Sequence, residues 1–186
     1  MKNLLRILVL LAGACPSLFS QQTYLQAYGQ PQTDLNRTNA IVQLSDTTYV
    51  LGGEWNGIGV LMKVNYKGTL LDYFFLDGSI PGTSTVLDLA LDPGGNIIAV
   101  GECENCLPGD TLKKVFAVHT EPSLLFINSK IYEGTEPTNN LLFTPSINRK
   151  GNQLLLATTT GGPLLNFEDV ALHAITANLD TLWRKT

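Results

Sequence analysis

The sequence has little that would favour a charged partner, a metal or a redox cofactor. Charged residues make up only 15% of the 186 residues, and the net charge of -4 comes with no basic cluster. Nucleic-acid binding normally needs such a cluster, so no nucleic-acid partner is expected. With only 2 histidines and 3 cysteines, the chain offers few ligands for a zinc site, and we expect neither a metal nor a cofactor.

The common catalytic and ligand-binding motifs are also missing from the sequence. There is no Asp-x-Asp-x-Asp-Gly calcium loop, no Gly-x-x-x-x-Gly-Lys phosphate loop and no Gly-x-Ser-x-Gly nucleophile turn. His119 and His173 lie in or at the end of apolar runs, where a packed or surface histidine is expected more often than a general base. We therefore assign no catalytic residue and favour a protein that is not an enzyme.

The N-terminus has the pattern of a signal peptide. Lys2 and Arg6 provide the positive charge, and an apolar segment covers positions 4–14. This segment is too short to cross a bilayer comfortably, so no membrane span is expected after removal of residues 1–20. Cys15 leaves lipoprotein processing open as an alternative to ordinary cleavage. The sequence thus predicts a protein that is secreted or held at the outer cell surface, with the periplasm as the alternative.

Export changes the interpretation of the two cysteines that remain, Cys103 and Cys106. In an oxidising compartment, a Cys-x-x-Cys pair is more often a local disulfide than half of a metal site. A thioredoxin-like redox pair would sit at the start of a helix, whereas this pair follows a predicted strand. A disulfide that closes a loop, or two unpaired thiols, is the favoured interpretation.

From residue 23 onward no window shows the apolar spacing of a helix. Short apolar runs instead alternate with Gly, Asn, Asp and Pro, which is typical of β-strands joined by turns. The clearest hairpin surrounds Asp92-Pro93-Gly94-Gly95, where proline fixes one φ angle and the glycines permit positive φ. We predict an all-β protein.

The predicted strands repeat with a period of roughly 50 residues. From Gly53 to Gly101 is about 48 residues, and from Gly101 to Thr158 about 57. Four short antiparallel strands per repeat is the size of a propeller blade. We therefore predict a partial β-propeller of about three four-stranded antiparallel blades within 21–186. The predicted units are 38–76, 85–132 and 139–186, with a separate closing strand at 23–29.

Within each unit the same residue types recur in the same order: an apolar strand, an Asp-type turn, a strand ending in Gly, and later an Asn/Asp-x-x-Gly turn before a strand that can carry Trp. The matching residues are Asp46, Tyr49, Gly53, Lys63, Asn65 and Gly68, then Asp92, Gly95, Asn96 and Gly101, then Gly151, Asn152, Asp180 and Trp183. This pattern resembles the β-propeller repeats of secreted bacterial surface proteins, of the delta-60 and SBBP type. The match departs at Thr158, which stands where the pattern has the strand-ending Gly.

The resemblance implies a scaffold or binding module without a universal catalytic residue. We therefore expect an exported, non-enzymatic module that binds a protein or a glycan, or a structural module at the cell surface. One alternative is a fragment of an extracellular hydrolase or lyase, and another is a subunit that completes a propeller with a partner or by self-association. Because a closed propeller normally has at least four blades, we expect the chain to be a piece of a longer protein.

The candidate ligand-binding residues lie in two predicted loops. Trp55 and Asn56 follow the second strand of the first unit, and Glu102 and Glu104 flank Cys103 in the second. An exposed Trp could form a platform for a sugar or a protein, and the carboxylates could bind a cation or sugar hydroxyls. A packed Trp and a solvated acidic loop are the structural alternatives.

Overall fold

The computed structural model describes residues 36–109, 113–132, 145–161 and 168–185. These residues form strands and turns, with no helix among them, and hence no helix that could cross a membrane. The strands are β1 (Asn36–Ser45), β2 (Thr48–Trp55), β3 (Ile58–Asn65), β4 (Leu70–Phe75), β5 (Thr83–Leu91), β6 (Ile97–Glu104), β7 (Lys114–Thr120), β8 (Phe126–Tyr132), β9 (Ser146–Lys150), β10 (Gln153–Gly161), β11 (Glu168–Ile175) and β12 (Thr181–Lys185).

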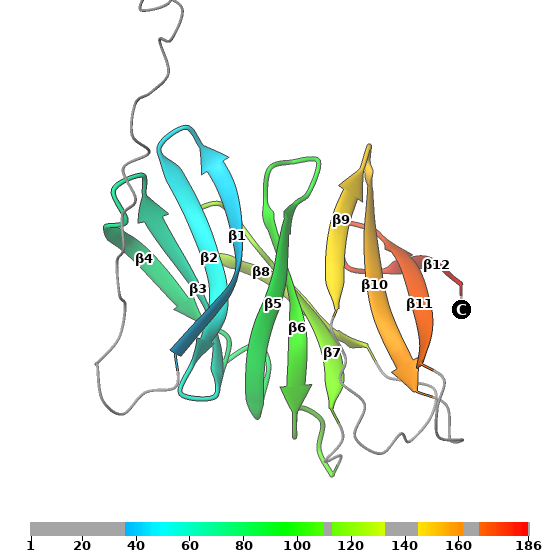
Figure 1. Cartoon of the computed structure of the whole chain (residues 1–186). Helices are drawn as coiled ribbons and strands as arrows, with labels where there is room; N and C mark the ends of the chain where they lie inside the picture. Colours follow the sequence, from blue (N-terminus) through cyan, green and yellow to red (C-terminus); the bar gives the residue numbers. More distant parts are fainter. Residues whose placement is uncertain (1–35, 110–112, 133–144, 162–167, 186) are drawn as a thin grey trace, which may run out of the picture.

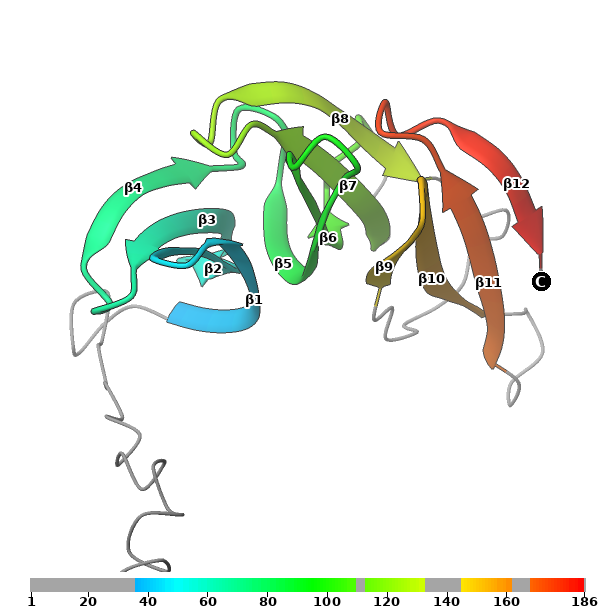
Figure 2. The ribbon, with the colours of Figure 1, turned by 90° about the horizontal axis from the view of Figure 1, so that it is seen from above.

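The strands form three separate four-stranded antiparallel sheets. Sheet 1 contains β1 to β4, sheet 2 contains β5 to β8 and sheet 3 contains β9 to β12, each with its strands paired in sequence order (Figure 1). Seen from above, the sheets stand side by side in an arc, with β4, β8 and β12 along its convex side (Figure 2). The expectation of an all-β chain with three four-stranded antiparallel units is confirmed.

Sheet 2 is packed on both of its faces. In β6, all residues from Ile97 to Val100 are 0% exposed. Successive side chains of a strand point to opposite faces, so Ile97 joins one core with Leu61 of sheet 1. Ile98 joins a second core with Leu154 of sheet 3. Each such aliphatic side chain stabilises the fold by about 1.5–3 kcal/mol on burial, and the two cores hold the three sheets together.

The strand pairing places three residues at the same position of the three sheets. Each lies near the end of its second strand and pairs with the third strand. The pairs are Gly53–Val60, Gly101–Phe116 and Thr158–Ala171. The glycine spacing that the sequence shows therefore corresponds to a structural repeat.

In sheets 1 and 2 the close approach of the first strand requires glycine at this position. A Cβ atom on Gly101 would collide with the carbonyl oxygen of Thr85, where β5 bulges. The glycine of sheet 1 meets the same obstacle. In sheet 3, β9 begins at Ser146, opposite Ala157, so the pairing of β9 does not reach Thr158.

One five-residue turn recurs four times. Its first residue bonds through N–H to the carbonyl of the fifth, and its fourth residue bonds through N–H to the carbonyl of the first. The four turns are Asn65–Thr69, Asp92–Asn96, Glu121–Leu125 and Thr176–Asp180. The fourth residue has positive φ, which suits Gly68 and Gly95, yet Leu124 and Leu179 adopt φ 65°. Both leucines are buried in the cores between sheets, and this burial offsets a backbone cost of about 1–2 kcal/mol.

Two strands extend further than the sequence pattern predicts. We expected loops at Glu54–Gly57 and from Glu102 onward, but β2 continues to Trp55 and β6 continues to Glu104. The reason is pairing with neighbouring strands. Trp55 pairs with Asn36 of β1 and with Ile58 of β3, and Glu104 still pairs with Thr83 of β5. The predicted signal peptide at 1–20 and closing strand at 23–29 lie outside the described residues.

The bulge beside Gly101 makes this glycine a test of the fold. We expect Gly101→Ala to lower the free energy of unfolding by about 1–3 kcal/mol or more, because the added methyl group overpacks rigid backbone. Gly78→Ala is the matched control, since nothing lies within 4 Å of the added Cβ atom. Urea denaturation of both variants measures the difference, and equal stabilities would contradict the bulge geometry.

Candidate functional site

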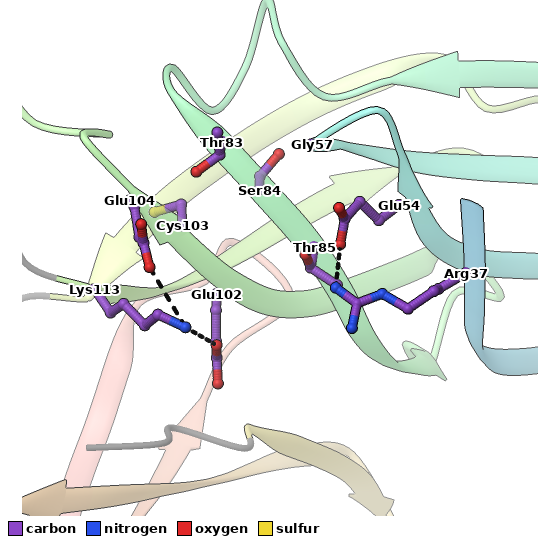
Figure 3. Close-up of a pocket in the computed structure, with 10 residues that line it drawn as sticks. All are labelled: Arg37, Glu54, Gly57, Thr83, Ser84, Thr85, Glu102, Cys103, Glu104 and Lys113. Atoms are coloured by element: carbon purple, nitrogen blue, oxygen red, sulfur yellow. Dashed lines mark hydrogen bonds and ion pairs between the residues drawn. The ribbon is translucent and has the colours of Figure 1, made fainter. Parts of the chain in front are cut away.

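A polar pocket lies at the ends of β2 and β6, beside the start of β5 (Figure 3). Its volume is about 240 Å³, slightly below the usual range of about 300–1,000 Å³ for small-molecule sites. The lining residues come from sheets 1 and 2, and most of them are polar or charged. They are Arg37, Glu54, Gly57, Thr83, Ser84, Thr85, Glu102, Cys103, Glu104 and Lys113.

Glu54 is the carboxylate on the sheet 1 side of the pocket, and it is fully engaged. Its Oε2 accepts hydrogen bonds from Nη2 of Arg37 and Oγ1 of Thr85, each at 2.7 Å. Burial by itself would raise the pKa of Glu54. The hydrogen bonds from Thr85 and Arg37, the charge of Arg37 and a backbone hydrogen bond from Gly57 outweigh burial and lower it. Glu54 therefore joins sheet 1 to sheet 2 as a carboxylate.

Glu102 is the carboxylate on the sheet 2 side, and its partners are weaker. Nζ of Lys113 lies 3.5 Å from Oε2 of Glu102 and 3.4 Å from Oε1 of Glu104. Burial raises the pKa of Glu102, Lys113 partly opposes this, and the negative charge of Glu104 adds to it. With a side chain only 16% exposed, Glu102 is a poorly solvated acceptor that a ligand could engage.

Glu54 and Glu102 occupy equivalent positions in neighbouring sheets. Each follows the glycine that ends the regular part of its second strand, and each pairs with the first strand, Glu54 with Arg37 and Glu102 with Thr85. Glu54 reaches across to the next sheet and bonds Thr85 there. At the equivalent place Glu102 is held only by Lys113 among the residues that the structure describes. The same position thus joins sheet 1 to sheet 2 at Glu54, and at Glu102 it carries a poorly solvated carboxylate that lines the pocket.

The structure unites only part of the predicted ligand-binding set. Glu102 and Glu104 line the pocket, whereas Trp55 and Asn56 are not among its lining residues. Trp55 follows Glu54 in β2, so its side chain points to the opposite face, where its ring meets the edge of Phe75 at a centroid distance of 6.1 Å. Its position supports the packed-tryptophan alternative.

Sequence reasoning missed the charged lining residues Arg37, Glu54 and Lys113 and the hydroxyl residues Thr83, Ser84 and Thr85. The signal for Glu54 was present, because the spacing of about 48 residues that aligns the glycines also aligns Glu54 with Glu102. Arg37 lies beside Glu54 because β1 pairs with β2, and Lys113 lies beside Glu102 and Glu104 just before β7, which pairs with β6. The packing of sheet 1 on sheet 2 brings these two groups into one pocket, and the sequence has no local signal for it.

Cys103 and Cys106 are joined by a disulfide, with their Cα atoms 5.9 Å apart. Both residues are almost fully buried in the core between sheets 1 and 2. Cys103 is the last but one residue of β6 and lies between the two pocket carboxylates. The disulfide therefore fixes the end of the strand that carries Glu102 and Glu104.

His119 has a partner that the sequence did not indicate. Its Nε2 lies 3.1 Å from Oδ2 of Asp92, and the two side chains are 5% and 3% exposed. Asp92 also accepts a hydrogen bond from the backbone N–H of Asn96, and its carbonyl accepts one from Arg149 of sheet 3. Because no substrate can reach so buried a pair, it stabilises the β5–β6 turn rather than acting as a general base.

His173 is likewise a packed residue. It is 8% exposed, and its ring lies 6.0 Å from that of Tyr132 in the contact between sheets 2 and 3. Burial lowers the pKa of His173, and the charge of Arg184 adds to this. The described residues contain no group of three or more His, Cys, Asp or Glu side chains that could hold a metal ion.

Comparison with known proteins gives no relative for this chain. No family model matches the sequence, and no curated protein matches it either. The interpretation of the pocket therefore rests on its own geometry and charges.

The two equivalent glutamates should respond to pH in opposite directions. The pKa of Glu54 is lowered in the fold, so its carboxylate stabilises the protein above its unfolded-state pKa. That contribution is lost as pH falls through the folded-state pKa. We expect Glu54→Gln to cost about 1–3 kcal/mol at neutral pH and progressively less in acid.

The pKa of Glu102 is raised, so its charged form destabilises the fold above the folded-state pKa. We expect Glu102→Gln to increase the free energy of unfolding at neutral pH and to have no such effect in acid. Urea denaturation across pH 3–7 measures both variants, with Glu121→Gln on the exposed β7–β8 turn as the control. The same pH trend for both glutamates would contradict the pocket geometry.

The disulfide should contribute measurably to stability. Closing this short loop is expected to be worth about 2 kcal/mol, so a thiol reductant should lower the free energy of unfolding by about that amount. The double variant Cys103→Ser/Cys106→Ser should be equally destabilised and insensitive to reductant. Two free thiols in the unfolded, unreduced protein, measured by alkylation and mass spectrometry, would disprove the bond.

Proposed function

We propose that this protein is an exported β-propeller-type binding module that holds a polar, hydroxyl-rich ligand such as a glycan unit in the pocket between sheets 1 and 2. The observation that carries the proposal is the set of open acceptors and donors in this pocket. Glu102 and Glu104 provide carboxylate oxygens, and the Arg37 side chain, which is 66% exposed, lines the same pocket. Carboxylates and guanidinium together can accept from and donate to the hydroxyls of a sugar.

The packing of the three sheets supports the propeller. A propeller stacks four-stranded sheets radially, so that each blade covers the face of the next. Sheet 2 is covered in this way on both sides, and β5 contacts β1, β2 and β3 of sheet 1 as well as β9 of sheet 3. The resemblance to delta-60 and SBBP-type repeats and the export of the protein belong to the same proposal. They rest on the motif residues and on the N-terminal segment.

One observation favours hydrolysis as a second candidate function. The pocket holds two carboxyl groups whose pKa values are shifted apart, that of Glu54 downward and that of Glu102 upward. Such a difference in pKa is what a general acid and an ionised partner require. Binding remains the first candidate, because Glu54 is already engaged by Arg37 and Thr85.

A glycan array followed by calorimetry tests the proposal. We expect the exported protein to bind at least one oligosaccharide and Glu102→Gln to weaken this binding at least tenfold, equivalent to about 1.4 kcal/mol. Glu121→Gln, which changes a carboxylate outside the pocket, should bind like the original protein.

Three results separate the candidates. Binding without turnover supports the module, and release of reducing sugar that Glu102→Gln abolishes supports the hydrolase. Binding that Glu102→Gln leaves unchanged, or no oligosaccharide bound at all, overturns the proposed site.

A further inference from the structure

Several polar groups of the pocket between sheets 1 and 2 already have partners within the protein. Glu54 accepts hydrogen bonds from Arg37 and Thr85, and its charge is balanced by that of Arg37. Oγ of Ser84 accepts a hydrogen bond from the backbone N–H of Gly59 at 2.8 Å. The kind of ligand that the pocket selects therefore depends mainly on its other charged side chains.

The other charged side chains are two carboxylates and one ammonium group. Glu102 and Glu104 lie two residues apart in β6, so their side chains leave the same face of the strand. Nζ of Lys113 lies 3.5 Å from Oε2 of Glu102 and 3.4 Å from Oε1 of Glu104 (Figure 3). Among the lining residues, this side of the pocket thus has one positive charge for two negative charges.

The two ion pairs of Lys113 are long. Hydrogen bonds between an ionised N–H donor and a carboxylate usually measure about 2.7–2.9 Å. The contact between Arg37 and Glu54 has such a length, 2.7 Å, whereas Lys113 is further from both of its glutamates. The Lys113 side chain is also 38% exposed, and exposed ion pairs contribute little to stability. A cation on a ligand can therefore compete with Lys113 for the carboxylates.

Glu102 is the carboxylate that a second cation would stabilise most. Its side chain is 16% exposed, whereas that of Glu104 is 45% exposed. Burial raises the pKa of Glu102, the negative charge of Glu104 adds to this, and Lys113 opposes it only in part. An opposite charge nearby favours the ionised carboxylate, and it does so more strongly in a partly desolvated site than in bulk water.

A protonated amine suits this site better than an anionic group. An ammonium group has three N–H donors and no acceptor, so it can donate to both carboxylates at once. A carboxylate or phosphate on the ligand would instead be repelled by the excess negative charge beside Glu102 and Glu104.

The rest of the pocket favours an amine that is surrounded by hydroxyl groups. Its lining residues include no large apolar side chain among those that the structure describes, so the alkyl stem of a peptide lysine would have no apolar partner there. Arg37 and Thr83, which also line the pocket, offer N–H and O–H groups instead. The volume of about 240 Å³ is small, which limits the enclosed part of a ligand to a group such as one sugar residue.

We propose that the ligand of this pocket is a basic amino sugar whose protonated amine binds between Glu102 and Glu104. Its hydroxyl groups then bond Arg37 and Thr83. This inference rests on the proposed glycan-binding function and specifies the class of glycan. Lys113 is the residue that determines the strength of amine binding, because its ammonium group occupies the same carboxylates in the free protein.

Isothermal titration calorimetry with two oligosaccharides of equal length tests the inference. One is β-1,4-linked glucosamine with free amines, and the other is β-1,4-linked glucose, which has a hydroxyl group in place of each amine. At about pH 6, where amines are protonated, we expect the full-length protein to bind the glucosamine oligosaccharide at least tenfold more tightly. The two probes differ only in the amines, so the difference in affinity measures their recognition.

Two variants connect this preference to the pocket. Glu104→Gln should weaken binding of the glucosamine oligosaccharide, because it removes one of the two carboxylates. Lys113→Gln should strengthen that binding by about threefold or more, because it removes a competing cation, and should give glucose no such advantage. Lys67→Gln, on the exposed β3–β4 turn outside the pocket, is the matched control for loss of a lysine. Thermal unfolding shows that each variant is folded.

Equal binding of the two oligosaccharides, or binding of other glycans but not of the glucosamine one, overturns this inference and leaves the proposed function intact. A folded Lys113→Gln variant that gains no affinity for the glucosamine oligosaccharide also overturns it. Oligolysine that binds as tightly as the glucosamine oligosaccharide overturns the assignment to a sugar, because charge alone is then recognised. If no oligosaccharide binds, the proposed function itself fails.

Discussion

Sheet 2 has apolar side chains on both faces, and sheets 1 and 3 keep them from water. Four consecutive residues of β6 have no exposed surface, because sheet 1 covers one face of sheet 2 and sheet 3 covers the other. The hydrophobic effect therefore stabilises the arc of three sheets, because each of the two cores is shared by two neighbouring sheets. The pocket, the disulfide and the buried Asp92–His119 pair all lie where this stack joins one sheet to the next.

The repeat explains how similar sheets acquire different roles. At one position of the repeat, Glu54 of sheet 1 accepts a hydrogen bond from Thr85 of sheet 2 and so joins the two sheets. At the equivalent position of sheet 2, Glu102 lines the pocket beside Lys113. The recurring turn shows a similar difference between repeats. At Leu124 and Leu179, a position that suits glycine holds a leucine that packs in the adjacent core.

The pocket combines charges that no single strand provides. Arg37 and Glu54 belong to sheet 1, and Glu102, Glu104 and Lys113 belong to sheet 2. Because Glu54 and Glu102 lie in different sheets, they have different neighbours. Arg37 and Thr85 hold Glu54 by hydrogen bonds, whereas Glu102 remains poorly solvated. Both proposed functions of the pocket depend on this difference in environment.

The sequence by itself determined the local structure and its repetition. Alternating apolar residues specify strands, Asp92 to Gly95 specifies a tight turn, and the glycine spacing reveals equivalent positions, because these features depend only on neighbouring residues. The sequence did not determine how far β2 and β6 continue, which depends on pairing with both neighbouring strands. Only the tertiary structure decided that Glu54 and Arg37 join Glu102, that Trp55 packs on another face, and that His119 meets Asp92. Those outcomes depend on which faces of the sheets meet, and the contacts that fix this lie roughly 20 to 60 residues apart in the chain.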